Sequence, residues 1–257
     1  MVPAQPLELF SAAYRRHERV AAAVVVASPD SALPAGSILM TAGNTGGQAA
    51  PLPLQDAIQA LLSRALETGR PSVLGGSTEA LRVLALPLAL PPRLLLLGGA
   101  PDAQPLVDLA ARLTWHITVH DHRSAYAQQV RFPHAEQVVL GRPETLAQTL
   151  DLARFDAAIV MSHHLTSDLA YLRVLSGSRI PYVGLLGPTN RREKLLADLG
   201  DDAAGLNGRL RSPIGLNIGG RAPESIALSI IAEIHARLHG APGGAFEGRE
   251  REQHERN

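Results

Sequence analysis

The sequence predicts an α/β protein in which a Rossmann-like domain with a doubly wound parallel sheet follows a smaller α/β domain. In the second half, short apolar runs alternate with helical segments, which is typical of parallel strands covered on both faces. A proline-punctuated segment, Leu86–Pro92, separates this half from the first. Two glycines directly follow the apolar run Leu94–Leu97, as they do in the opening of a dinucleotide-binding βαβ unit.

The first domain, residues 1–86, shows mixed helix and strand periodicity. Apolar residues at helical spacing alternate with short apolar runs, and Gly69 is a good helix stop. The predicted elements are a helix over about 6–18, strands over 20–27 and 37–41, a helix over 55–68, and strands over 72–74 and 81–86. We expect a linker over 87–92.

The second domain, residues 93–240, repeats a strand-then-helix order. We expect strands at 94–97, 117–120, 138–140, 157–161 and 182–186, and helices at about 104–113, 144–150, 167–176 and 190–199. A last helix starts at Pro223, a residue favoured at the first helical position. Residues 241–257 combine glycine, proline and mixed charge, which predicts a disordered tail.

The overall composition excludes several classes of site and partner. The chain has 24 basic and 24 acidic residues, so net charge gives no reason to expect nucleic acid or an anionic membrane as partner. It has no cysteine, which excludes disulfides, thiolate nucleophiles and cysteine-ligated zinc. The start shows no signal-peptide pattern and the apolar runs are too short to span a bilayer, so we expect a cytoplasmic protein.

The glycine turn is an imperfect dinucleotide fingerprint. Gly98 fits the tight turn and Gly99 follows it, but Ala100 occupies the position where a second glycine would admit a pyrophosphate. Pro101 and Pro105 remove two backbone donors that could have bound a phosphate. The turn therefore indicates the fold more clearly than the ligand.

Asp121 closes the second strand of this unit. It could accept a hydrogen bond from a ribose hydroxyl, or it could cap the turn that follows it. The alternating histidines His116, His120 and His122 could ligate a metal. However, side chains two residues apart on a strand lie about 6–7 Å apart, so we expect no metal site here.

Two further turns follow predicted strands, where open α/β sheets bind ligands. In Ser162-His163-His164, a histidine could act as an acid or base, and Asp168 could orient it or favour the start of the next helix. In the segment Gly187–Arg192, a glycine, Asn190 and Arg191 could form an anion site, or the arginines could be surface charge.

The glycine-rich loop Ile214–Gly220 precedes the last helix. It could let backbone approach a ligand, or it could be only a tight turn.

Several of these segments together resemble the XdhC/CoxI family, the accessory proteins of bacterial xanthine dehydrogenases and related molybdenum hydroxylases. The resemblance covers nearly the whole length and is strongest from residue 94 onward. The similar segments are Leu94–Gly98 with the following turn, Val119–Arg123, Arg131–Pro133, Met161–His163 with Asp168, Pro181–Gly187, Pro213–Gly219 and Pro223–Ile230. In the first domain Pro34–Thr41 is similar to a family segment, and Gly46-Gly47-Gln48 stands where the family has Gly-Gly-Cys.

The resemblance implies a chaperone that binds the molybdenum cofactor, of the molybdopterin type, protects it during sulfuration and delivers it. The partners implied are an apo molybdenum hydroxylase, a cysteine desulfurase and a second copy of the chain. We expect a carrier more than a catalyst. The expected cofactor-binding residues are Gly98, Gly99, Ala100, Asp121, Arg123, Ser162, His163, Gly187, Asn190, Arg191, Gly215, Asn217, Gly219, Gly46 and Gly47.

Two alternatives stay open at this point. An NAD(P)-dependent oxidoreductase would place Asp121 on a ribose and use His163, with Asp168, as acid–base catalyst. A repurposed paralogue of the family would bind another nucleotide-like ligand or serve as a scaffold.

Overall fold

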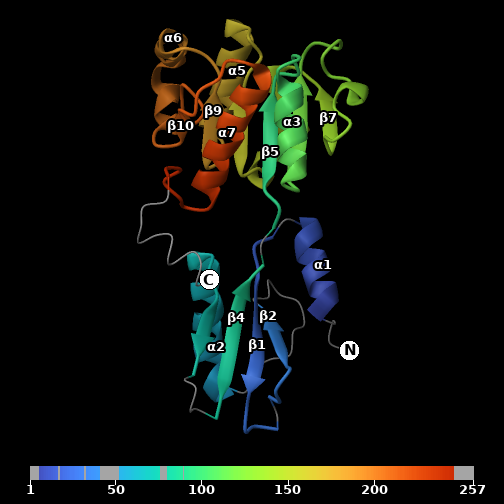
Figure 1. The fold of residues 1–257 in the computed structure, drawn as a ribbon, viewed down its shortest axis with the longest axis vertical. Helices are drawn as coiled ribbons and strands as arrows, with labels where there is room; N and C mark the ends of the chain where they lie inside the picture. The colour runs from blue at the N-terminus through green and yellow to red at the C-terminus, as the bar shows by residue number, and fades with distance from the viewer. Residues whose placement is uncertain are drawn as a thin grey trace. The chain divides into compact units, whose positions relative to one another are not determined.

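The computed structural model describes residues 6–16, 18–31, 33–40, 52–75, 80–88 and 90–245. The chain divides into two compact units, Met1–Leu90 and Pro91–Asn257, which are described separately below (Figure 1). The predicted cofactor loop at Gly46 and Gly47 lies outside the described residues, as does the predicted tail beyond 245.

The first unit is an antiparallel sheet covered by a helix. The strands β1 (Ala21–Ala27), β2 (Ile38–Met40), β3 (Ser72–Leu74) and β4 (Arg82–Pro87) pair in the order β2-β1-β4-β3. The helices are α1 (Pro6–Arg16) and α2 (Leu52–Thr68). Residues of β1 and β4 at alternate positions pack against the apolar face of α2, because strand side chains alternate between faces.

One strand of this unit extends beyond its predicted end. β4 reaches Pro87, which pairs with Ala21, and the Leu88 N–H donates to the Val20 carbonyl. The strand thus enters the predicted 87–92 linker. A proline is tolerated there because β3 pairs only with Val83–Ala85, so no neighbour needs the missing N–H.

The second unit contains a six-stranded sheet whose paired strands are all parallel, in the order β10-β9-β8-β5-β6-β7. This confirms the doubly wound sheet predicted from the alternating pattern. The strands are β5 (Arg93–Leu97), β6 (His116–Asp121), β7 (Gln137–Leu140), β8 (Ala157–Val160), β9 (Tyr182–Leu185) and β10 (Leu210–Arg211). The two-residue β10 was not predicted, because it is too short to carry a periodic signal.

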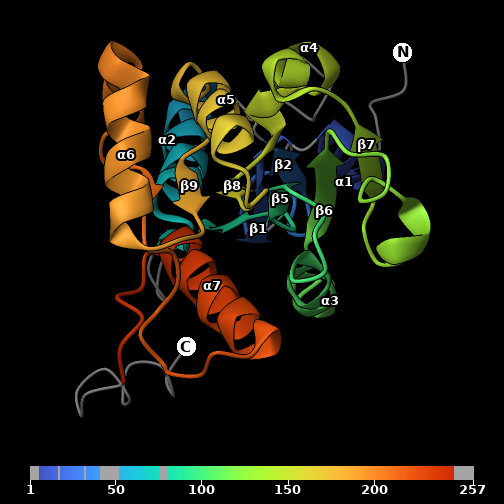
Figure 2. The ribbon, with the colours of Figure 1, turned by 90° about the horizontal axis from the view of Figure 1, so that it is seen from above.

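Helices cover both faces of this sheet (Figure 2). The longer ones are α3 (Ala103–Arg112), α5 (Leu165–Ser176), α6 (Thr189–Leu199) and α7 (Pro223–Leu238). Leu94 and Leu96 pack with α3 and α7, while Leu95 and Leu97 pack with α5 and α6. Alternate side chains of β5 therefore belong to two separate hydrophobic cores, one on each face of the sheet. Figure 2 shows α3 and α7 on one side of the strands and α5 and α6 on the other.

The helix predicted at 144–150 is reduced to a 3-10 turn, Pro143–Thr145, followed by the single turn α4 (Leu146–Thr149). Leu146 is buried and holds this short segment against the core that contains α5. Further 3-10 turns lie at Gln129–Arg131, Leu152–Arg154 and Gly200–Leu206. Among the residues that the structure describes, no helix is both long and apolar enough to cross a membrane.

The order of the strands places a topological switch point between β5 and β8. The chain runs from β5 outward through β6 and β7, and then returns to β8 on the opposite side of β5. Open α/β sheets bind ligands at the carboxyl ends of the strands beside such a point. Gly98 brings the two turns together there: it has a φ of +129°, and a Cβ would lie 2.5 Å from the Met161 carbonyl oxygen.

Candidate functional site

Asp121 holds the glycine turn after β5. Its Oδ2 accepts from the Gly99 N–H at 2.8 Å and from Arg123 Nη2 at 2.7 Å. Its Oδ1 accepts from the Arg123 N–H at 2.8 Å and from Arg123 Nε at 2.9 Å. The side chain is 0% exposed. Burial alone would oppose its ionisation, but the hydrogen bonds from Arg123 and Gly99 outweigh it and lower the pKa of the Asp121 carboxyl.

This geometry argues against the expectation that Asp121 binds a ribose. A carboxylate offers about four lone-pair positions, and four hydrogen bonds from within the protein already use them. The contacts of Asp121 agree with the alternative expectation, that this residue fixes the local turn. Arg123 is likewise committed to Asp121, and its guanidinium lies 4.2 Å from the ring centroid of Tyr126.

Two other donors of the same turn are also used within the protein. The Gly98 N–H donates to the His120 carbonyl, and the Ala103 N–H donates to the carbonyl of Ala100. Pro101 has no N–H. Gly99 cannot be replaced without a shift, because a Cβ there would lie 2.6 Å from a backbone oxygen. The β5–α3 turn is therefore tightly packed, and of its N–H groups only those of Ala100 and Asp102 are left for a ligand.

The turn between β8 and α5 contains a second buried carboxylate, Asp168. Its Oδ1 accepts from the Ser162 hydroxyl at 2.5 Å and from the Ser162 N–H at 3.2 Å. Its Oδ2 accepts from Arg191 Nη2 at 2.6 Å. Both Ser162 and Asp168 are 0% exposed, so the ion pair fixes the start of α6 against the start of α5.

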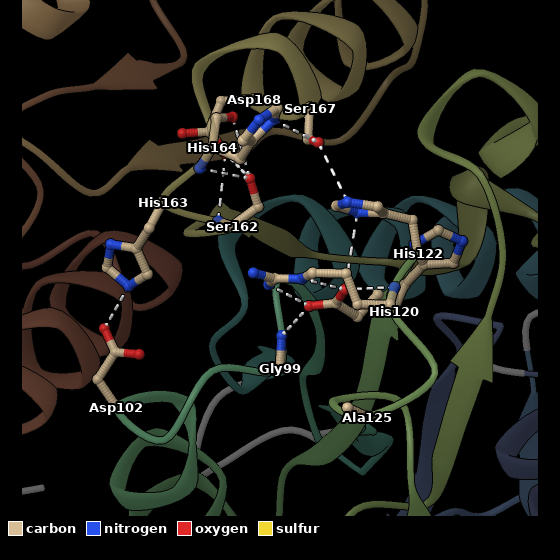
Figure 3. Close-up of polar contacts among 12 residues, drawn as sticks. Gly99, Asp102, His120, His122, Ala125, Ser162, His163, His164, Ser167 and Asp168 are labelled. Atoms are coloured by element: carbon tan, nitrogen blue, oxygen red, sulfur yellow. Dashed lines mark hydrogen bonds and ion pairs between the residues drawn. The ribbon is translucent and has the colours of Figure 1, made fainter.

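Of the two roles considered for Asp168, the orientation of His163 is not the one seen, because the hydrogen-bond partner of His163 is Asp102. His163 Nε2 lies 2.7 Å from Asp102 Oδ2, and Figure 3 shows the ring turned toward that carboxylate. Asp102 precedes α3 but makes no side-chain cap bond to it. Since this hydrogen bond joins the β5–α3 turn to the β8–α5 turn, it spans the switch point.

His163 also has an unusual backbone. Its φ is +60°, a left-handed conformation that few non-glycine residues adopt. The hydrogen bond to Asp102 raises the pKa of the His163 imidazole against the opposing effect of burial. The side chain is 51% exposed, so the ring stands at the surface of the carboxyl edge, by which we mean the strand ends and the loops that follow them.

Two further imidazoles meet at the first turn of α5. His164 Nδ1 lies 3.2 Å from the Ser167 hydroxyl, and His122 Nε2 lies 3.4 Å from the same oxygen (Figure 3). Ser167 was not singled out from the sequence. Its position two residues past the helix start gave no signal, because its two partners follow different strands.

The alternating histidines of β6 do not converge. His120 is 0% exposed and its Nδ1 lies 2.9 Å from the Tyr171 hydroxyl, whereas His116 lies 3.1 Å from Glu136 at the other end of the strand. Burial lowers the pKa of His120 to about 4, so its ring is neutral at physiological pH. Within the described ranges no group of three or more His, Cys, Asp or Glu side chains could hold a metal ion.

The start of α6 carries the predicted anion-binding residues. Gly187 has a φ of +141°, and a Cβ there would lie 2.7 Å from Arg191 Cδ, so the glycine leaves room for the arginine to fold back toward Asp168. Asn190 is exposed, and its Oδ1 accepts from the Arg191 N–H at 2.8 Å. Pro188 makes no side-chain cap bond, which leaves the first helical N–H groups available.

The loop Ile214–Gly220, which precedes α7, is hydrogen-bonded to that helix. The Gly215 N–H donates to Glu233 Oε2 at 2.5 Å, and a Cβ at Gly215 would collide with the Ser229 hydroxyl. Asn217 and Gly219 are both exposed, and nothing lies within 4 Å of a Cβ built at Gly219. Gly215 thus packs the loop onto α7, while Asn217 and Gly219 remain open to a ligand.

Two sets of expected site residues differ in how they are held. One set is committed to the turn at Gly99, Asp121 and Arg123. The other set, at Ser162, His163 and Arg191, lies around the switch point. Asp102 completes the second set and was missed, since nothing in its local sequence distinguishes it from a helix-capping aspartate.

Comparison with known proteins identifies the second unit. Residues 94–234 match the XdhC Rossmann domain family. A Bacillus subtilis protein, described as a probable xanthine dehydrogenase subunit, is 38% identical over 143 residues, which are 56% of this chain and 42% of that protein. The uncharacterized Escherichia coli protein YqeB is 26% identical over 220 residues, 81% of this chain and 40% of that protein. The chain thus spans about two fifths of the length of these relatives.

A solved structure covers both units. The crystal structure of a xanthine dehydrogenase from Bacillus halodurans aligns with 93% of this chain and 96% of its own, with a TM-score of 0.54 and 17% identity, and supports the fold. The family match spans more than half of the chain and confirms the resemblance seen in its sequence segments. The chain belongs to the XdhC family.

Proposed function

We propose that this protein binds the molybdenum cofactor and inserts it into a molybdenum hydroxylase of the xanthine dehydrogenase type. Family membership over residues 94–234 is the observation that carries this proposal. The description of the Bacillus subtilis relative as part of a probable xanthine dehydrogenase supports the same partner. An apo hydroxylase, a cysteine desulfurase and a second copy of the chain are the partners proposed.

The donor set at the switch point fits a phosphate-bearing pterin. The free N–H groups at the starts of α5 and α6, the Arg191 guanidinium and the Asn190 amide all suit an anionic or hydrogen-bonding ligand. His163 and the loop residues Asn217 and Gly219 would add contacts from neighbouring segments. When bound, the cofactor supplies molybdenum chemistry to the partner enzyme, while the residues of this chain bind and orient it.

The proposed role is that of a carrier. Asp168, the candidate to assist a catalytic histidine, is buried in a hydrogen-bonded group with Ser162 and Arg191. This arrangement positions the arginine at the site and assigns no bond-breaking step to the carboxylate.

The pyridine-nucleotide alternative has weaker support. It requires Asp121 to accept from a ribose, but the lone-pair positions of that carboxylate are engaged within the protein. It also requires the β5–α3 turn to bind a pyrophosphate, for which only the Ala100 and Asp102 N–H groups of that turn remain. A repurposed family member with another nucleotide-like ligand remains compatible with the donors at His163 and Arg191.

Mass spectrometry of ligand released from the native protein tests the proposal. Protein purified from a molybdenum-replete host should release a molybdopterin-type pterin, and protein from a molybdenum-depleted host serves as the control. The purified, loaded protein should also activate an apo xanthine dehydrogenase. If the replete protein carries no pterin and takes none up from added cofactor, the proposal is wrong.

A further inference from the structure

The His163–Asp102 pair has features that capping and packing do not explain. His163 has a left-handed backbone conformation, and its imidazole is hydrogen-bonded to a carboxylate 61 positions away in the sequence. Strained residues persist where the surrounding structure over-determines them, and they cluster at ligand sites. Asp102 makes no side-chain cap bond at the start of α3, and its carboxylate contacts the ring instead.

The hydrogen bond fixes which nitrogen of the ring titrates. A carboxylate can only accept, so His163 Nε2 carries a hydrogen and donates it to Asp102 Oδ2. Protonation of the ring therefore takes place at Nδ1. That nitrogen points away from Asp102 (Figure 3), and no described residue forms a hydrogen bond with it. Protonation thus creates a new outward-facing donor.

Protonation of His163 decides the net charge of the groups around the ring. Asp102 from the β5–α3 turn, Asp168 from α5 and Arg191 from α6 are the charged groups that act on His163. Their sum is −1, so the neutral ring stands in a net negative set that repels an anion. Protonated His163 brings the set to zero, so that the partial positive charge at the start of α6, whose first turn has no acidic residue, favours an anion.

We propose that the His163–Asp102 pair is a protonation-dependent anchor for an oxyanionic group, in chemistry a phosphate ester, of the ligand bound between the ends of β5 and β8. This inference rests on the proposed function for the placement of the ligand, and it adds the group recognised and the pH dependence of binding. The imidazolium donates Nδ1–H to the oxyanion, and Asp102 holds the ring in position. The affinity for the anion therefore falls as the pH rises through the pKa of His163.

Histidine-selective NMR of the full chain tests this with sulfate, whose charge is constant between about pH 6 and about pH 8. We expect the His163 resonance to shift with sulfate, and its pKa to rise when sulfate is bound, because binding and protonation are reciprocally linked. The affinity at about pH 6 should exceed that at about pH 8 by about tenfold, as expected of a hydrogen bond to a charged group. A pH-independent affinity, or shifts confined to other histidines, would overturn the proposal.

Two variants separate the roles of the pair. In His163→Asn, which retains a residue that tolerates the left-handed conformation, the pH dependence should disappear and the affinity at the lower pH should fall by about tenfold. In Asp102→Asn the ring loses its carboxylate, so the pH midpoint of binding should move to lower pH. The matched control is His134→Asn. His134 lies away from the carboxyl edge, and its Nδ1 is 2.9 Å from Asp108 Oδ1, with which it forms a hydrogen bond. This variant should leave binding unchanged.

Isolated molybdopterin and NAD⁺, each titrated against wild type and His163→Asn, identify the source of the phosphate. If sulfate binds as described but molybdopterin does not, the proposed function fails and the anchor stands. If molybdopterin binds equally to wild type and His163→Asn at both pH values, the anchor fails and the proposed function stands. If only NAD⁺ shows the expected loss in His163→Asn, the anchor holds a dinucleotide phosphate instead.

Discussion

Two carboxylate pairs lie at the carboxyl edge of the same sheet, and they are built in opposite ways. Asp121, paired with Arg123, is 0% exposed and accepts four hydrogen bonds from the protein. Asp102, paired with His163, is 29% exposed, and its partner is 51% exposed. A saturated, buried pair fixes the backbone, whereas a half-exposed pair keeps a ring nitrogen, His163 Nδ1, available to a ligand. The difference favours the second pair as the place of the ligand.

Replacing Asp121 by alanine should have the largest effect on stability. It leaves the Gly99 N–H and the Arg123 guanidinium without their buried partner, and breaking a buried ion pair in this way costs about 3–5 kcal/mol. Urea unfolding of the full chain, followed by a probe in the Rossmann unit, measures the loss. The matched variant Asp102→Ala removes a partly exposed pair, which should cost about 0–1 kcal/mol. Equal losses in the two variants would contradict the distinction between the pairs.

The pH dependence of stability should include a contribution from His120, the buried histidine next to Asp121. The pKa of His120 is lowered from 6.5 to about 4, so its contribution is complete above the unfolded value and is lost as the pH falls from 6.5 toward 4. The shift corresponds to about 3 kcal/mol. His120→Gln should flatten the stability profile in this window. An unchanged slope would show that the ring does not stay neutral in the folded protein.

Asp121 contributes at more acid pH. Because its folded pKa lies below the ordinary 3.8, its stabilisation is present above that value and is lost on acidification below it. His163 acts in the opposite direction: its stabilisation is present below 6.5 and is lost as the pH rises through its raised pKa.

Replacing glycines by alanine should have a smaller effect on stability, and Gly98 and Gly219 form a matched pair for this comparison. Gly98→Ala combines a positive φ with a Cβ 2.5 Å from a backbone oxygen of the β8 turn, so we expect a loss of about 2–3 kcal/mol. Gly219→Ala has a positive φ but nothing within 4 Å, and should lose about 1 kcal/mol. Thermal unfolding compares the two. A loss at Gly219 as large as that at Gly98 would mean that the contact between the two turns contributes nothing.

The smallest effect on stability should come from His163→Asn. The ring is half exposed and asparagine tolerates its backbone conformation, so stability should stay within about 0.5 kcal/mol of wild type. A loss of several kcal/mol would show that the pair, like Asp121–Arg123, mainly fixes the backbone.

The sequence predicted the sheet because each buried strand and its following helix carry a local pattern. The apolar runs from Leu94 and from Ala157 indicated parallel strands, and the glycines and prolines marked the turns. It could not predict the partners of the charged residues. The bond between His163 and Asp102 depends on β8 lying beside β5, which is a property of strand order and not of local pattern. The fingerprint aspartate, Asp121, fits both a ribose contact and a structural contact in sequence; only its four hydrogen bonds favour the second.

A crystal structure of the protein with its cofactor bound tests the central claim most directly. We expect the phosphate of a molybdopterin-type ligand within hydrogen-bond distance of His163 Nδ1 and close to the start of α6, with the four hydrogen bonds of Asp121 unchanged. A ligand lying across the Gly99 turn, with a hydroxyl on Asp121 and Arg123 displaced, would contradict the account.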